Sequence, residues 1–366
     1  MRLGLLFALL ALLGLAGCAN LAYLNQAAQG EAAVLQKARP IPEVIADPDT
    51  PPTVADKLRM AQRMRQFAVT ELKLPDNSSY TRYADTGRSY VLWNVVSAPP
   101  LSLKPVESCF PIAGCLAYRG YYAEDEAQAW AKAQLAAGND VFVYGVPAYS
   151  TLGWFGDPLL NTTVRYGELS LARLIFHELA HQVLYVRDDS AFNEAFATAV
   201  ELEGIERWLA MRHAPRLDEA YRKGEAQQAA FMGLMSDARR KLAAIYGGNE
   251  TDAAKLAAKH EIQQATRVAY LALKAEWGGY DGYDHWFDPL PNNAHMASLA
   301  TYHRLVPAFR ELICEQAGDM AAYYAQVRAL AQKNKAERDE ALTALEVAAD
   351  QGRCSKEDKL LRRELY

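Results

Sequence analysis

The sequence is poor in cysteine and histidine and has no apolar run of membrane-spanning length. Five cysteines among 366 residues include no C-x-x-C pair, which argues against a metal site built from cysteines. Basic residues form no long block and the net charge is −5, so the chain lacks the basic surface of a nucleic-acid-binding protein. With 51% hydrophobic and 23% charged residues, it has the composition of a folded protein with one large or two moderate domains.

An apolar run at the N-terminus, residues 3–15, has the length of a signal-peptide core and is too short to span a membrane. It ends in Leu15-Ala16-Gly17-Cys18, which has the form of a lipobox. We therefore expect Cys18 to be the lipidated residue of a lipoprotein. The alternative is an ordinary signal peptide in which Cys18 is incidental, although a small-residue cleavage site alone needs no cysteine.

Two histidines close together mark the centre of the chain, in the sequence His177-Glu178-Leu179-Ala180-His181. On a helix, His177 and His181 lie on one face and can bind one metal ion from the same side. Glu178 then lies close enough to a metal-activated water to act as a general base without being a ligand. This is the H-E-x-x-H motif of zinc peptidases. The alternative is a helix with two surface histidines.

A third metal ligand is expected on the following helix, because catalytic zinc takes three protein ligands and leaves one position open. The polar segment 187–190 predicts a turn between helices over about 168–185 and 191–210. If these helices pack antiparallel, Glu194 comes opposite the two histidines. We expect one Zn²⁺ per chain, with the ligands His177, His181 and Glu194.

Asn193-Glu194-Ala195-Phe196-Ala197 resembles the N-E-G-F-A segment of gluzincin aminopeptidases, in which the glutamate is the third zinc ligand. The chain as a whole resembles a family of bacterial lipoproteins regarded as zinc aminopeptidases. The segments that carry this resemblance span most of the chain: 109–115 (C-F-P-I-A-G-C), 118–121 (Y-R-G-Y), 148–158 (A-Y-S-T-L-G-W-F-G-D-P), the H-E-L-A-H helix, 189–194 (D-S-A-F-N-E) and 292–294 (N-N-A). The resemblance implies a zinc-dependent peptidase, with aminopeptidase as the family activity.

Two departures from the better-known gluzincin aminopeptidases stand out. The gap between His181 and Glu194 is shorter than theirs. The chain also has no G-x-M-E-N segment, with which those enzymes grip the amino terminus of a substrate. The residues therefore support zinc chemistry better than they support specificity for an amino terminus.

The lipoprotein resemblance also implies how the chain is organised and where it resides. It predicts a signal peptide over 1–17, a lipidated N-terminus and proline-rich tether over 18–53, and a body over 54–366. Within the body we expect the sheet and the metal helices in about 54–210 and further helices in 211–366. The alternative for the tether is an early helix, 21–37, that packs on the body. Asn20 resembles the signal for sorting to the outer membrane of a Gram-negative cell, facing the periplasm, where substrates would be peptides or protein segments.

The predicted elements indicate an α+β fold that is mainly helical and zincin-like. Strand-like segments lie within about 80–150, and we expect this small sheet to pack on the metal-binding helix. A strand over 140–150 would form the upper rim of the cleft, where an extended substrate adds to its edge. Pro147 suits an edge strand. Tyr149, at the end of this strand, is a candidate substrate-binding residue.

Four cysteines remain if Cys18 is lipidated, and an envelope compartment permits disulfides. Three pairings of Cys109, Cys115, Cys314 and Cys354 are possible, and the sequence does not choose among them. We favour the pairing of near neighbours, which joins Cys109 to Cys115 and Cys314 to Cys354.

A second group of candidate site residues lies near position 300. The oxyanion that forms on a substrate carbonyl needs a hydrogen-bond donor, and other zincins use a tyrosine or histidine from a later helix. Tyr302 and His303 are candidates for this role, and Asn292 and Asn293 for binding the substrate backbone. A buried tyrosine and helix-capping asparagines are the alternatives.

The sequence predicts a membrane-anchored zinc peptidase in which Glu178 is the general base. The alternative is an envelope binding or assembly protein with a structural or vestigial metal site, and hydrolysis of a non-peptide amide is a third reading. Glu178 favours catalysis, because a structural site needs ligands but no general base. Glu201, two turns beyond Glu194, either accepts a hydrogen bond from a ligand histidine or lies on a solvated helix face.

Overall fold

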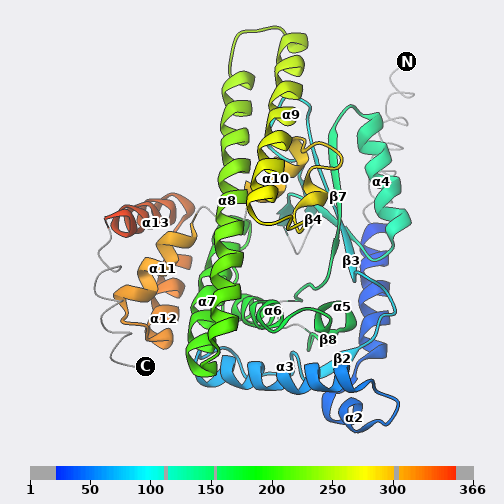
Figure 1. The fold of residues 1–366 in the computed structure, drawn as a ribbon, viewed down its shortest axis with the longest axis vertical. Helices are drawn as coiled ribbons and strands as arrows, with labels where there is room; N and C mark the ends of the chain where they lie inside the picture. The colour runs from blue at the N-terminus through cyan, green and yellow to red at the C-terminus, as the bar shows by residue number, and fades with distance from the viewer. Residues whose placement is uncertain (1–21, 111–113, 152–154, 301–304, 352–366) are drawn as a thin grey trace, which may run out of the picture.

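Helices dominate the structure, a computed structural model that describes residues 22–110, 114–151, 155–300 and 305–351 (Figure 1). The helices are 22–37, α2 (Ile41–Ala46), α3 (Pro52–Thr70), α4 (Glu124–Ala136), α5 (Asn161–Val164), α6 (Glu168–His181), α7 (Ser190–Arg212), α8 (Pro215–Tyr246), α9 (Asp252–Glu276), the 3-10 helix η1 (Asp284–Trp286), α10 (Asn293–Ala300), α11 (Val306–Glu315), α12 (Met320–Ala331) and α13 (Lys335–Asp350). The strands are β1 (Arg39–Pro40), β2 (Arg82–Ala84), β3 (Leu92–Ala98), β4 (Ser108–Phe110), β5 (Gly114–Leu116), β6 (Arg119–Tyr121), β7 (Asp140–Val146) and β8 (Leu159–Leu160). The mainly helical α+β class is confirmed.

The larger sheet lies between two helices. It is antiparallel with the order β6-β3-β7, and its register places Asn94 opposite Tyr144. Side chains alternate along β7, so that Val141 and Val143 pack with α4, whereas Phe142 and Tyr144 face α10. Among the described strands β7 pairs with β3 alone, which makes it the predicted edge strand.

Helix α6, which carries His177 and His181, packs on α3 and α7, whereas the larger sheet packs on α4 and α10. The buried face of α6 carries Leu171, Ile175, Phe176 and Leu179. The expected packing of a sheet on this helix is found only for the smaller sheet, β1-β2-β8, through Tyr83 and Leu159. The alternation of apolar residues shows that a strand face is buried, but it does not show which helix covers that face.

The helix over 22–37 packs on the larger sheet. Nε2 of Gln26 donates a hydrogen bond to the carbonyl of Gly120 in β6 (3.2 Å), and the N–H of Gly120 donates one to Oη of Tyr23 (3.2 Å). The proline-rich stretch that follows forms β1 and α2. The alternative of a packed helix, rather than a tether over 18–53, therefore describes these residues.

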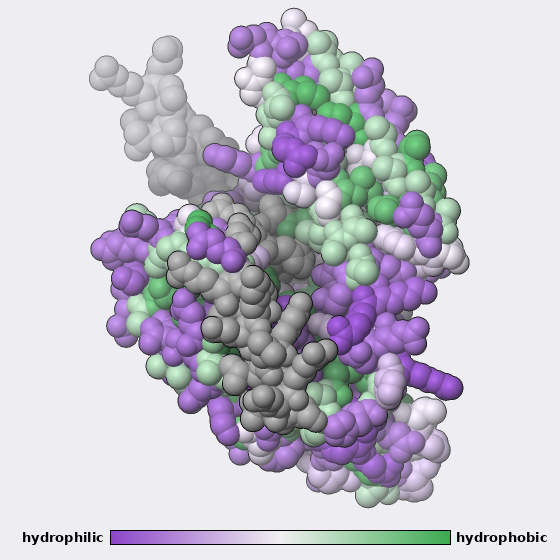
Figure 2. Space-filling view, turned by 60° about the vertical axis from the view of Figure 1, so that its left-hand side comes forward, coloured by the Kyte–Doolittle hydropathy of each residue, from purple (hydrophilic) through white to green (hydrophobic). Residues whose placement is uncertain are grey.

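The second half of the chain completes the body and adds a projecting arm. Helix α10 covers the larger sheet, and α11 packs on α7 and α13. Helices α8 and α9 form a long antiparallel hairpin that extends beyond the rest of the molecule (Figure 1). On the face shown in Figure 2, hydrophilic and hydrophobic side chains are interspersed over this arm. Within the described part of the chain, no helix combines the length and the apolar character needed to cross a membrane.

A disulfide joins Cys109 to Cys115, which stand opposite each other in the β4-β5 hairpin. The favoured pairing of these two cysteines is therefore confirmed. Cys314 is also disulfide-bonded, and Cys354, its predicted partner, lies outside the described residues.

Candidate metal centre

The consecutive helices α6 and α7 pack together and bring three possible ligand atoms into a triangle. Nε2 of His177 lies 3.2 Å from Nε2 of His181 and 3.3 Å from Oε2 of Glu194. The third side, from Nε2 of His181 to Oε2 of Glu194, measures 3.8 Å. The three predicted ligands therefore meet at one point, on the side of α6 opposite its buried apolar face.

These separations fit a zinc ion. Nitrogen and oxygen ligands lie about 2.0–2.2 Å from zinc, so two of them at a tetrahedral angle stand about 3.4 Å apart. Two histidines and one glutamate are also a known ligand set of catalytic zinc. One other cluster of this kind exists among the described residues, Glu107 with Cys109 and Cys115, but its two sulfurs are joined in the disulfide.

The turn before Glu194 is held by side chains on both of its sides. Oδ1 of Asn193 accepts a hydrogen bond from the N–H of Val186 (2.8 Å), and Nδ2 donates one to the carbonyl of Val186 (2.7 Å). Asp189 caps the start of α7. Arg338 of α13 donates to Oδ2 of Asp189 at 2.6 and 3.0 Å, and both side chains are buried. The C-terminal helix thus anchors the start of the helix that carries the third ligand.

A glycine allows α7 to approach α6 closely. A Cβ atom at Gly204 would lie 2.6 Å from a ring carbon of Phe176 and 2.7 Å from Cδ1 of Leu72. Carbon atoms in favourable contact are about 3.5–4.0 Å apart, so no larger residue fits without a shift. Because Phe176 precedes His177, this contact helps to set the distance between α6 and α7 beside the ligand-type side chains.

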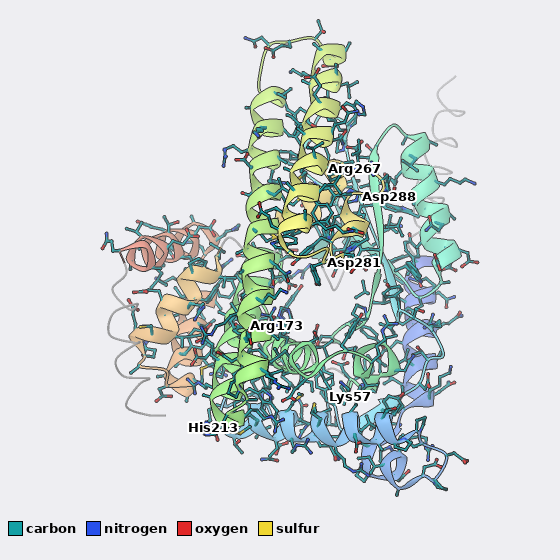
Figure 3. The ribbon with its side chains drawn as sticks, in the orientation of Figure 1. Lys57, Arg173, His213, Arg267, Asp281 and Asp288 are labelled. Carbon is teal, nitrogen blue, oxygen red and sulfur yellow. A yellow bond between two sulfur atoms is a disulfide. The ribbon has the colours of Figure 1, made fainter. Side chains whose placement is uncertain are left out.

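Glu201 holds His177 from the side away from the other ligands. Its Oε2 lies 3.1 Å from Nδ1 of His177, and its Oε1 lies 3.5 Å from Nη1 of Arg173. Arg173 also forms an ion pair with Glu225 of α8, and Figure 3 shows Arg173 on α6 beside that helix. A carboxylate on Nδ1 orients the ring and leaves Nε2 as the acceptor for a metal. Of the two alternatives for Glu201, the hydrogen-bonded one is found.

Glu178 lies in a group of acidic side chains on the open side of α6. Burial raises the pKa of Glu178 to about 7, and the charges of Glu194 and Asp157 add to this, while His177 opposes it. A carboxyl group whose pKa is near neutrality can both accept and return a proton. A cation bound nearby would lower this pKa, because it favours the charged carboxylate.

The pKa values of His177 and His181 are shifted in opposite directions. Burial alone lowers the pKa of His177, but its hydrogen bonds to Glu194 and Glu201 outweigh burial and hold the pKa well above its ordinary value. Burial lowers the pKa of His181 to about 4, and the charge of His177 adds to this. Burial raises the pKa of Glu194, yet the hydrogen bond from His177 gives a net lowering. The carboxylates of Glu194 and Glu201 therefore favour the protonated ring of His177, whereas burial favours the neutral ring of His181.

Three tyrosines lie near Glu194. Burial raises the pKa of Tyr118, Tyr144 and Tyr185, and the charge of Glu194 contributes to each increase. Tyr144 belongs to β7, and its Oη accepts a hydrogen bond from Nδ2 of Asn94 (3.4 Å). The raised pKa values keep the hydroxyls protonated at neutral pH, so the metal centre has hydrogen-bond donors nearby.

The side chains of Asn292 and Asn293 are both engaged in hydrogen bonds within the fold. Oδ1 of Asn292 accepts from the N–H of Ala294 (2.9 Å), and its Nδ2 donates to a carbonyl of β7 (2.9 Å). Asn293 is fully buried, and its Nδ2 donates to two backbone carbonyls that follow β3 (3.0 Å each). The capping alternative therefore describes Asn292, whereas the buried amide of Asn293 joins α10 to the segment after β3 and to Tyr246 of α8. Tyr302 and His303 lie outside the described residues.

Tyr149 follows β7 and contacts the N-terminal helix. Its hydroxyl donates a hydrogen bond to Oε2 of Glu31, which also accepts one from Oη of Tyr122 (2.9 Å). The rings of Tyr122 and Tyr149 meet edge to face, with centroids 5.8 Å apart. Tyr149 also lines a small cavity next to α6, so it lies near the predicted rim of the cleft.

Sequence reasoning missed Arg173, which pairs with Glu201, and it missed Tyr80 and Asp157, which lie close enough to Glu178 to interact with it electrostatically. Arg173 precedes His177 by one helical turn on the same face, and this spacing is a signal that the sequence contains. Tyr80 and Asp157 come together because β2 pairs in parallel with β8, and no local pattern reveals such a pairing.

Comparison with known proteins identifies a family. A family model described as "Putative aminopeptidase" matches residues 22–342. The match covers most of the chain, including all of α6 and α7, so the chain belongs to this family. No curated protein and no solved structure matches the chain.

Proposed function

We propose that this member of the putative aminopeptidase family is a zinc peptidase that hydrolyses peptide bonds with Glu178 as its general base. The observation that carries the proposal is the triangle of ligand atoms, with sides of 3.2, 3.3 and 3.8 Å, beside the carboxyl group of Glu178. Family membership supports peptide hydrolysis, and the ligand set supports zinc. Glu178 supports catalysis over a structural ion, because a structural site needs no base.

Zinc, when bound, supplies a Lewis acid that activates a water molecule and polarises the substrate carbonyl. Glu178 accepts a proton from this water while the water oxygen bonds to the carbonyl carbon. The carbon–nitrogen bond then breaks, and Glu178 passes the same proton to the leaving nitrogen. Glu178 thus returns to its starting state, and the products are a carboxylic acid and an amine.

The oxyanion that forms on the substrate carbonyl needs a donor, and we propose Tyr118 or Tyr144 for this role. Both lie close enough to Glu194 for its charge to raise their pKa values, and both hydroxyls are protonated at neutral pH. Replacing the donor by phenylalanine should lower kcat about 10²–10³-fold. Tyr302 and His303 stay predictions for the same role.

We further propose that the protein is anchored by lipid on Cys18 to the outer membrane, facing the periplasm of a Gram-negative cell. The lipobox-like sequence that ends at Cys18 and the apolar run before it support this location. Peptides or protein segments of the periplasm are then its substrates, and the acidic net charge disfavours nucleic acid.

Metal content and a conservative variant test the function together. The soluble protein without residues 1–18 should hold about one zinc per chain, and Glu194→Ala should lose it. Glu178→Gln should keep the zinc and lose peptide hydrolysis by about 10²–10⁴-fold. Glu206→Gln is a matched control, because Glu206 lies on α7 but pairs with Arg310 at 2.7 Å instead of facing the ligands.

Each outcome separates the alternatives. Absence of zinc after reconstitution would refute the metal centre. Zinc that is retained without cleavage of any member of a broad peptide library would favour the binding-protein alternative. Zinc that survives Glu194→Ala would show that another residue is the third ligand.

A further inference from the structure

A groove lies where helix α9 ends beside α8, at the base of the projecting arm (Figure 1). Its volume is about 400 Å³, which is within the range of pockets that hold small molecules. Its lining consists of Lys223, Ala226, Gln227, Glu276, Trp277 and Gly278. The candidate metal ligands and Glu178 are not among these residues, so the groove needs an explanation of its own.

The groove opens on the side of α8 that faces away from α6. Lys223 and Gln227 are about one turn apart and share a face of α8. Glu225 lies between them in the sequence and therefore on nearly the opposite side of the helix, where it forms its ion pair with Arg173 of α6. The groove is thus separate from the cluster of side chains around His177.

Gln227 brings an unsatisfied hydrogen-bond donor to this groove. The residue is 7% exposed, and its Nε2 is buried without a hydrogen-bond partner among the described residues. Burying an amide without a partner costs free energy, and buried polar groups of native proteins almost always have one. A ligand with an acceptor oxygen, bound in the groove, would supply the missing partner.

The charges around the groove disfavour a ligand with a net charge. Lys223 and Glu276 are both exposed, and neither belongs to an ion pair within the described part of the chain. Glu276 is also the last residue of α9, where the final carbonyl groups have no partner within the helix and carry partial negative charge. An anion is repelled from the α9 side and a cation from Lys223. The groove therefore suits a neutral ligand that both donates and accepts hydrogen bonds.

Trp277 gives the groove an aromatic wall. Its ring is held by Tyr283 and Tyr270, whose ring centroids lie 6.0 and 6.5 Å away, and it stays partly exposed. The face of an aromatic ring carries partial negative charge, which attracts the C–H groups on the apolar face of a sugar ring. Ala226 adds a methyl group to the same lining.

We propose that this groove binds a neutral sugar unit of a glycan, with one face of the sugar ring on Trp277. Hydroxyl oxygens accept hydrogen bonds from Nε2 of Gln227 and Nζ of Lys223, and other hydroxyls donate to the carboxylate of Glu276. A sugar suits this mixed lining because each hydroxyl is both a donor and an acceptor. The inference does not depend on the proposed peptidase activity, and it makes the arm a second binding element of the protein.

An extended peptide fits the groove less well. Peptides are commonly bound along the edge of a sheet, where backbone groups of the protein pair with those of the peptide. The groove is built from α8 and the end of α9, and the backbone groups within a helix are already paired with one another. It therefore offers side chains to a ligand rather than a row of backbone partners.

Binding of defined sugars to the soluble protein without residues 1–18 tests the inference. In calorimetric titrations with cellobiose and N,N′-diacetylchitobiose, two neutral disaccharides, we expect a Kd of about 1 mM or tighter for at least one of them. The binding should persist in Glu194→Ala, because the groove is separate from the candidate metal centre. Absence of binding by both disaccharides and by a wider panel of neutral oligosaccharides would overturn the inference.

Gln227→Leu places the sugar in the groove. Sugar binding should weaken at least about tenfold, whereas the melting temperature should stay the same or rise, because no unpaired amide is then buried. Gln264→Leu is the matched control on α9, since Gln264 is exposed and bonds to His260 (2.8 Å) outside the groove. Zinc content and peptide hydrolysis should be unchanged in both variants.

Three results would contradict the proposed ligand or its place. Unchanged sugar binding by Gln227→Leu would show that the sugar binds elsewhere. If Gln227→Leu lowers the melting temperature, Lys223→Met at the exposed rim decides instead: weaker sugar binding supports the inference, and unchanged binding overturns it. Tighter binding of a capped peptide, N-acetyl-tetraalanine amide, than of either disaccharide, lost in Gln227→Leu, would replace the sugar by a polypeptide.

Discussion

Nδ1 of His177 lies 3.1 Å from Oε2 of Glu201, which stands two turns beyond the third ligand on the same helix. This carboxylate orients the ring whose Nε2 faces the metal position. We expect Glu201→Ala to weaken zinc binding about 10- to 100-fold, as is usual for groups that orient a ligand histidine. Competition with a chelator would measure the affinity. Glu206→Ala on the same helix should leave it unchanged, and an equal loss in both variants would contradict the role of Glu201.

Zinc affinity should fall as the pH falls. The pKa of His177 in the metal-free protein is well above its ordinary value, because Glu194 and Glu201 stabilise the charged ring. Below that raised pKa the metal-free protein keeps a proton on His177 that zinc must displace, so affinity should decrease about tenfold per pH unit. Above it, no proton is displaced and the dependence should level off. Chelator competition at pH 6, 7 and 8 measures the slope, and a flat profile would contradict the protonated state of His177.

Gly204→Ala should loosen the packing of α7 on α6. The added methyl group would meet Phe176 at 2.6 Å, and overpacking of this kind costs about 1–3 kcal/mol. Urea unfolding would measure the loss, and zinc affinity should fall with it because Glu194 moves away from the histidines. Gly233→Ala in α8 is the matched control. Its Cβ would meet no atom within 4 Å, and alanine favours a helix over glycine, so stability should hold or rise.

Arg338→Ala should destabilise the protein and weaken zinc binding at a distance from the ligands. It removes the buried partner of Asp189 and leaves only Lys335, whose Nζ lies 3.7 Å from the same carboxylate oxygen. Breaking a buried ion pair costs up to about 3–5 kcal/mol. Thermal and urea unfolding would detect this loss. Arg328→Ala, at an exposed position on α12, should change stability little. If Arg338→Ala lowers stability but leaves zinc affinity intact, α13 does not position Glu194.

The cluster of His177, His181 and Glu194 could be predicted from the sequence because much of it depends on local geometry. His177, Glu178 and His181 share one helix, and Glu194 lies on the next helix, which the turn brings back beside the first. A helix repeats at a fixed spacing, so the shared face of His177 and His181 is determined before any tertiary packing is known, whereas the approach of Glu194 also needs the packing of α7 on α6. Glu201 and Arg173 lie on the same two helices and follow by the same rule.

The remaining parts of the site come from segments far apart in the chain. The contact of Glu31 with Tyr149 depends on how the N-terminal helix docks. The approach of Tyr80 to Asp157 depends on a parallel strand pair, and Arg338 reaches Asp189 only through the packing of α13. Hydrophobic alternation shows which face of a strand or helix is buried, but it does not identify the element that packs against that face. The same limit explains why the larger sheet lies on α4 and α10 rather than on α6.

The packed N-terminal helix also decides where a soluble form of the protein can begin. A truncation that starts at residue 54, where the sequence places the beginning of the body, would remove Glu31 together with the helix over 22–37. The hydroxyls of Tyr122 and Tyr149 would lose their shared acceptor. The carbonyl and the N–H of Gly120 in β6 would lose their hydrogen bonds to the side chains of Gln26 and Tyr23. Loss of function in such a short form would therefore report the loss of packed structure around β6 and Tyr149. Expression should start no later than residue 22.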